Sequence, residues 1–261
     1  MKRVMSVATS DSGAGAGIQA DLKSFLRCGV YGTTAIVATT AQNTVGVNAI
    51  FPFPPHVAVD QIEAIAEDIG ADAVKTGMLF NAEIIAAVSE AINRLSLPNV
   101  VVDPVMVAES GATLLEPEAI ETYKSDLLPL ATAITPNLNE AFAILGSDVD
   151  EGRVEEAAIE LRSFGPKAVV ITGGHTEAGA DLLYDGERFT KISGPIHEGG
   201  NAHGSGCTHS SAFASFLAMG FPLEDAARAA REVAAEAVKH GLAEIGAGAG
   251  PVHALGAFLS E

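Results

Sequence analysis

Hydrophobic and polar residues along the chain follow two spacings, one typical of strands and the other of helices. Short apolar runs rich in β-branched residues predict buried strands, whereas apolar residues three and four positions apart predict amphipathic helices. Ile18, Leu22, Phe25 and Leu26, for example, share one face of a predicted helix that ends before Gly29. Strands are predicted over residues 4–9, 33–40, 73–76, 99–103, 133–135 and 168–172. Helices are predicted over residues 18–28, 57–69, 82–95, 117–128, 138–145, 154–164, 206–219 and 223–240.

Most of the predicted strands are followed by a helix, an order that is typical of βαβ units. Such units form a mostly parallel sheet with helices on both faces. Late in the chain, Asp185-Gly186 separates two strand-like segments, 182–184 and 188–192, and predicts an antiparallel hairpin. The chain has 261 residues with no internal repeat and no long linker, so we expect a single α/β domain over residues 1–261.

Acidic residues outnumber basic ones by 33 to 15, which gives a formal net charge of −18. This balance argues against nucleic acid or a membrane surface as a partner, because both attract basic patches. Apolar residues make up 48% of the chain, which excludes a disordered acidic tail.

The two cysteines, Cys28 and Cys207, lie far apart in the sequence and form no CxxC motif. This spacing excludes a disulfide framework and a structural zinc site. Reduced thiols are therefore expected, and with them a cytoplasmic location. The N-terminus lacks the apolar run of a signal peptide, and no apolar stretch approaches the ~20 residues that a membrane helix needs.

Two loops at predicted strand or helix ends contain several glycines, and ligands in α/β folds bind beyond the carboxyl ends of the strands. The first loop, 10–17, differs from a dinucleotide-binding fingerprint because residue 18 is Ile rather than Gly. It is either a ligand-contacting loop or a flexible turn. The second, 203–208, begins a helix, and free N–H groups at such an end bind anions.

Cys207 lies in the first turn of that helix. This position lowers the pKa of a thiol and favours a reactive thiolate, although a small packed hydrophobic residue is the alternative. The two strand-end carboxylates, Asp103 and Glu140, are candidate Mg²⁺ ligands. Glu140 has its own alternative, because an acidic residue also stabilises the first turn of a helix.

The combination of these loops resembles the hydroxymethylpyrimidine and hydroxymethylpyrimidine phosphate kinases of thiamine biosynthesis, in the ribokinase-like superfamily. The resemblance rests on segments 10–23, 29–32, 40–44, 75–78, 102–108, 135–137 and 203–208, which occur in this order through nearly the whole chain. It implies a three-layer α/β/α fold, ATP and Mg²⁺ as cofactors, and an aminopyrimidine alcohol or its phosphate as substrate. It also implies a homodimer.

The resemblance also assigns roles to individual residues. Gln42 would bond the aminopyrimidine edge, in a pocket lined by Ala16, Asp21, Met78 and Val105. Mg²⁺ would be organised by Asp103 and Glu140. The nucleotide would be contacted by Asn137, Thr172, Gly174 and His203. The anion hole would be formed by Gly204, Ser205, Gly206 and Cys207, with the thiol beside the acceptor.

Three positions depart from the family pattern. Glu109 and Thr172 stand where the family often has lysine, and Ala202 stands where threonine is common. The first two departures remove positive charge near the expected nucleotide. Residues 109–118 are the candidate lid, since they show no clear periodicity.

Other functions fit parts of the same pattern. A pyridoxal kinase is the first alternative, because pyridoxal is also a flat nitrogen heterocycle with a hydroxymethyl group. Cys207 with an oriented histidine would instead be a nucleophile for acyl transfer. A pocket without turnover would make the chain a ligand-binding domain.

Overall fold

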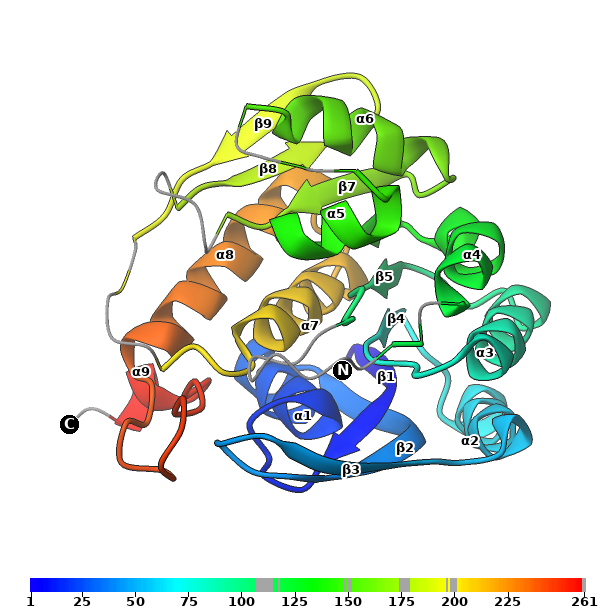
Figure 1. Ribbon diagram of the computed structural model, residues 1–261, viewed down its shortest axis with the longest axis horizontal. Helices are drawn as coiled ribbons and strands as arrows, with labels where there is room; N and C mark the ends of the chain where they lie inside the picture. The colour runs from blue at the N-terminus through cyan, green and yellow to red at the C-terminus, as the bar shows by residue number, and fades with distance from the viewer. Residues whose placement is uncertain are drawn as a thin grey trace.

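A central sheet organises the protein, which we describe from a computed structural model (Figure 1). The structure describes residues 1–106, 115–116, 118–147, 149, 152–173, 179–195, 197 and 201–259. Within them, nine strands form one sheet in the order β3-β2-β1-β4-β5-β6-β7-β8-β9. The strands are β1 Arg3–Asp11, β2 Tyr31–Gln42, β3 Val47–Pro52, β4 Ala73–Thr76, β5 Val100–Val102, β6 Ala133–Ile134, β7 Ala168–Ile171, β8 Asp181–Tyr184 and β9 Phe189–Ile192.

The sheet is parallel in its centre and antiparallel at both edges. Pairs β2–β1, β1–β4, β4–β5, β5–β6 and β6–β7 are parallel. Pairs β2–β3, β7–β8 and β8–β9 are antiparallel. The carboxyl ends of the six parallel strands β2, β1, β4, β5, β6 and β7 therefore meet at one edge of the molecule.

Helices cover both faces of the sheet, with α1, α7 and α8 on one side and α2 to α6 on the other (Figure 1). The bounds are α1 Gly17–Cys28, α2 Pro55–Asp68, α3 Ala82–Arg94, α4 Ala119–Thr122, α5 Leu138–Leu145, α6 Val154–Ser163, α7 Ser205–Ala218, α8 Leu223–Lys239 and α9 Gly256–Leu259. No helix in the described ranges is both long and apolar enough to cross a membrane.

Alternation along each strand divides the core into two layers. In β5, Val100 and Val102 pack with the α2–α6 layer, whereas Val101 packs with α1, α7 and α8. Successive side chains of a strand point to opposite faces, so a continuous apolar run serves both layers. The structure thus confirms the predicted three-layer α/β/α fold with its mostly parallel sheet and late hairpin.

Two elements differ from the sequence prediction. The edge strand β3 was not predicted, because most of its residues are exposed or half-buried and Phe51 faces solvent. The helix predicted over 117–128 is α4 followed by one π-helical turn, Tyr123–Leu127, and one 3-10 turn, Leu128–Leu130. Pro129 lies inside the 3-10 turn near its start, a position where its missing N–H is tolerated.

Candidate active site

A cavity of about 270 Å³ lies at the carboxyl ends of the parallel strands, against the N-terminus of α7. It is lined by most of the residues that sequence reasoning selected: Ala16, Gln42, Met78, Asp103, Val105, Asn137, Glu140, Thr172, His203, Gly204, Ser205, Gly206 and Cys207. Gly174, Glu109 and most of the expected lid lie outside the described residues. Segments far apart in sequence thus meet because parallel strands end at the same edge.

The N-terminus of α7 is shaped for close approach by an anion. Gly204 is the N-cap residue and has a φ of +86°, which favours glycine. Gly206 is exposed, and a Cβ there would meet no atom within 4 Å, so open space lies over the first turn. The positive end of the helix dipole and this open space suit a phosphate group.

Cys207 lies in the first turn of α7, but its protonation differs from the expectation. Burial raises the pKa of the Cys207 thiol to about 12, and the Asp103 and Asp21 carboxylates act in the same direction against Lys75. The prediction of a ready thiolate is therefore wrong for the free protein. The cost of desolvating the thiolate outweighs the stabilisation that the helix N-terminus gives it.

Lys75 is a buried cation that lines the cavity, and sequence reasoning did not select it as a site residue. Its Nζ lies 2.9 Å from Asp21 Oδ1 and 3.4 Å from Asp103 Oδ2, and all three side chains are almost fully buried. Burial alone lowers the pKa of Lys75, but the neighbouring Asp21 and Asp103 carboxylates outweigh it and keep the ammonium ionised. The sequence did offer one indication of its role, a lysine within a predicted strand. That strand, Ala73–Thr76, is buried at every position.

Asp21 corrects a second expectation, because it does not line the cavity. Asp21 is inaccessible to solvent. Its Oδ1 accepts hydrogen bonds from Lys75 Nζ at 2.9 Å and Ser211 Oγ at 2.8 Å, and its Oδ2 accepts from Ser6 Oγ at 2.5 Å. Both oxygens are occupied within the protein, so Asp21 supports the site from below as the counter-ion of Lys75.

Asp103 and Glu140 face the same cavity from β5 and α5. Ser210 Oγ donates to Asp103 Oδ2 at 2.8 Å. Glu140 forms a capping box with Asn137, which confirms its helix-stabilising alternative. Burial and the nearby Asp103 charge raise the pKa of Glu140 above its ordinary value, although the Asn137 N–H and Lys75 oppose the shift.

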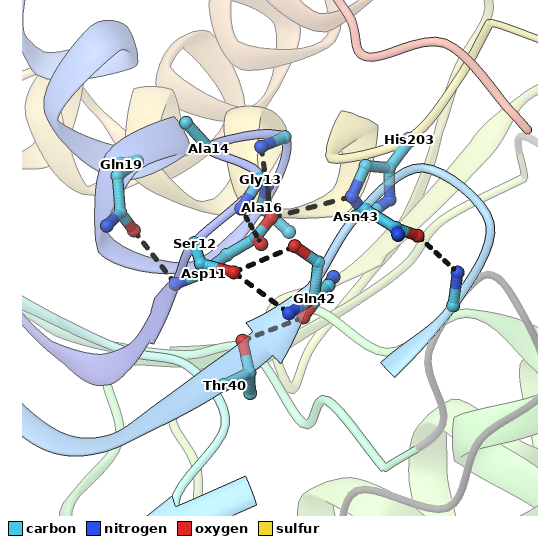
Figure 2. A network of polar contacts seen from close by, with 12 residues as sticks. Asp11, Ser12, Gly13, Ala14, Ala16, Gln19, Thr40, Gln42, Asn43 and His203 are labelled. Carbon is cyan, nitrogen blue, oxygen red and sulfur yellow. Dashed lines mark hydrogen bonds and ion pairs between the residues drawn. The ribbon is translucent and has the colours of Figure 1, made fainter. Parts of the chain in front are cut away.

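Gln42, the last residue of β2, also lines the cavity. Thr40 Oγ1 donates to Gln42 Oε1 at 3.1 Å (Figure 2). Ser12 Oγ donates to the Gln42 carbonyl and accepts from its N–H, both at 2.8 Å. A held carboxamide offers one donor side and one acceptor side, the pattern that complements the edge of an aminopyrimidine.

A second polar cluster, missed in the sequence, lies toward β8 and α8. Asp181 Oδ1 accepts from the Gly173 N–H at 2.8 Å, and its Oδ2 lies 3.3 Å from His209 Nε2. Burial raises the pKa of Asp181, but His209, Gly173 and Arg231 together hold it below its ordinary value. The cluster fixes the backbone immediately after Thr172, where nucleotide contacts are expected.

The fold and the site together define a phosphotransferase with the ribokinase-like fold. One similar solved structure is the Bacillus subtilis pyridoxal kinase in complex with ADP, with a TM-score of 0.91 and 37% identity over the full length of both chains. Among curated proteins, the Haemophilus influenzae hydroxymethylpyrimidine/phosphomethylpyrimidine kinase is 44% identical over 97% of this chain and 96% of its own.

The family is also matched directly. Residues 11–253 match the phosphomethylpyrimidine kinase family. A bifunctional thiamine biosynthesis protein of Geobacter sulfurreducens is 45% identical over 96% of this chain, which spans 51% of that protein's length. The chain belongs to the phosphomethylpyrimidine kinase family.

Proposed function

We propose that this protein uses ATP to phosphorylate the hydroxymethyl group of 4-amino-5-hydroxymethyl-2-methylpyrimidine and then the resulting monophosphate, two steps of thiamine biosynthesis. The observation that carries the proposal is one cavity lined together by Gln42, by the first turn of α7 and by the carboxylates of Asp103 and Glu140. Matching relatives of nearly the same length carry this activity in their names.

Phosphoryl transfer depends mainly on positioning and charge stabilisation. Gln42 orients the acceptor, and Met78 and Val105 provide apolar walls for its ring. The first turn of α7 receives the transferred phosphoryl group, so backbone groups supply much of the positive potential in a chain with 15 basic residues. Asn137, Thr172 and His203 lie along the donor phosphates.

The two carboxylates fit a divalent cation. Asp103 and Glu140 are hard oxygen ligands close enough for one charge to raise the pKa of the other. Among the described residues no group of three or more His, Cys, Asp and Glu could hold a metal ion, so Asp103 and Glu140 would hold Mg²⁺ together with water and phosphate oxygens. Bound Mg²⁺ neutralises charge on the donor phosphates.

The raised pKa of Glu140 makes Mg²⁺ binding depend on pH. Glu140 keeps its proton above the ordinary pKa of a glutamate, and binding of Mg²⁺ must release it. We expect the Mg²⁺ concentration at half-maximal activity to fall by up to about tenfold per pH unit while Glu140 titrates. Titrations of Mg²⁺ from pH 6 to 9 measure this, and Glu140→Gln should flatten the dependence. An equally steep dependence in Glu140→Gln would rule out Glu140 as its source.

Consumption of ATP with the pyrimidine alcohol, its monophosphate and pyridoxal, assayed side by side, tests the function. We expect the largest kcat/KM with the two pyrimidines. Turnover of pyridoxal alone would replace the proposal by the second candidate, a pyridoxal kinase, which the TM-score of 0.91 favours. No turnover with any acceptor would remove the kinase function.

We also propose the domain organisation, the cellular location and the oligomeric state. The nine-stranded sheet and the family match over residues 11–253 support a single kinase domain over residues 1–261. Both cysteines are free thiols, in keeping with a cytoplasmic location. The homodimer rests on the resemblance, and measurement of the molar mass in solution tests it.

A further inference from the structure

Asp11, at the carboxyl end of β1, holds a loop, residues 12–16, that contains Gly13 and Gly15. Its Oδ1 accepts from the Gly13 N–H at 2.7 Å, and its Oδ2 accepts from the N–H groups of Gly15 at 3.0 Å and Ala16 at 2.9 Å (Figure 2). Successive N–H groups turned toward one point form a nest that binds anions. The Asp11 carboxylate of the protein itself occupies this nest. The nest differs in this respect from the first turn of α7, which is open.

The same carboxylate reaches the loop that leads into α7. His203 Nε2 lies 3.6 Å from Asp11 Oδ2, and Asp11 is buried. Burial raises the pKa of Asp11, but His203 and the N–H groups of Ala16 and Gly13 outweigh it and keep the carboxylate ionised. Residue 203 directly precedes Gly204, the N-cap of α7.

The two loops also touch through their glycines. A Cβ on Gly15 would lie 2.2 Å from Cδ2 of His203, and a Cβ on Gly204 would lie 1.9 Å from the carbonyl oxygen of Gly15. Gly15 does not have a positive φ, so its own backbone would accept alanine. The close approach of the loops is therefore what requires glycine at position 15.

The acceptor end of the cavity is tied to this contact. Ser12, next to Asp11, exchanges two hydrogen bonds with the backbone of Gln42. One continuous set of contacts therefore runs from Gln42 through Ser12 and Asp11 to His203 and α7 (Figure 2).

We propose that Asp11 is a positioning residue that clamps the acceptor loop, residues 12–16, to the phosphate-binding turn of α7 through His203. The inference rests on the proposed kinase function. The clamp then keeps the acceptor oxygen at a fixed distance from the terminal phosphate of ATP. A misplacement of about 1 Å lowers the rate roughly 100-fold. A loosened clamp admits water, which attacks the terminal phosphorus of ATP in place of the acceptor, yielding ADP and inorganic phosphate.

Asp11→Asn tests the clamp, because it places an amide donor against the N–H donors of the loop. We expect kcat to fall by about 10- to 100-fold with the KM for ATP changed less than twofold. The ratio of ATP consumed to phosphorylated pyrimidine should rise above one. Asp72→Asn is the matched control, since Asp72 also accepts a backbone N–H and pairs with a base, Arg3, but at the opposite end of the sheet.

Gly15→Ala provides a second test that leaves Asp11 unchanged and pushes the loops apart. It should reproduce the excess ATP hydrolysis, whereas Gly46→Ala should not, because a Cβ on Gly46 would meet no atom within 4 Å. Thermal melts establish that each variant is folded. If wild type turns over the pyrimidine and both folded variants keep a ratio of one, the clamp is refuted and the kinase function stands. If wild type itself is inactive, the proposed function fails first.

Discussion

Replacing Lys75 with methionine should lower the free energy of unfolding by about 3–5 kcal/mol, the usual result of breaking a buried ion pair. Asp21 and Asp103 would then be buried beside each other's charge without the ammonium that contacts both. Urea unfolding at pH 7.5 measures the loss. Methionine keeps most of the side-chain volume, so the effect is electrostatic rather than a cavity effect.

Lys239→Met is the matched control for this prediction. Lys239 pairs with Glu236 on the surface of α8, where such a pair contributes about 0–1 kcal/mol. Equal losses in the two variants would show that Lys75 is not required as a counter-ion.

Cys207→Ala should lower kcat/KM for the pyrimidine alcohol by about 10²–10⁴-fold, the range for a group that takes part in proton transfer. The loss for the monophosphate should be much smaller. A hydroxymethyl acceptor must release a proton during the reaction, whereas a phosphate oxygen is already ionised. Separate kinetic assays with the two acceptors measure the difference.

The raised pKa of Cys207 adds a second signature to this prediction. With a pKa of about 12, the thiolate fraction grows by about tenfold per pH unit across the neutral range. If the thiolate is the base, kcat/KM for the alcohol should rise with pH from 7 to 9, and the monophosphate should lack this rise. Cys207→Ala should remove the slope. Equal losses on both acceptors, with the slope retained, would exclude Cys207 as the base.

Much of the site was predictable because it consists of strand ends. Asp103 ends one predicted strand, Glu140 follows another, and the anion-binding turn begins a predicted helix. Parallel strands end at one edge, so sequence order alone brings such residues to the same cavity. The edge strand β3 was not predictable in this way, because an exposed antiparallel edge lacks a buried apolar run.

Other features depended on contacts between distant segments. Lys75 in β4, Asp21 in α1 and Ser211 in α7 meet beneath the cavity, although 54 and 190 positions separate Asp21 from the other two. Their types in the sequence gave no sign of this meeting. The same holds for the cluster of Asp181, His209 and Arg231, which joins β8, α7 and α8.

The sequence by itself determined the alternation of strands and helices apart from β3, the mostly parallel sheet with helices on both faces and the position of the ligand-binding edge, because these follow from local periodicity and the geometry of parallel sheets. Only the tertiary structure decided which charges are buried and how they are protonated. It made Cys207 a thiol, Asp21 a counter-ion and the glycine-rich loop a partner of His203. Desolvation and Coulomb interactions depend on distances between remote residues, and only folding sets those distances.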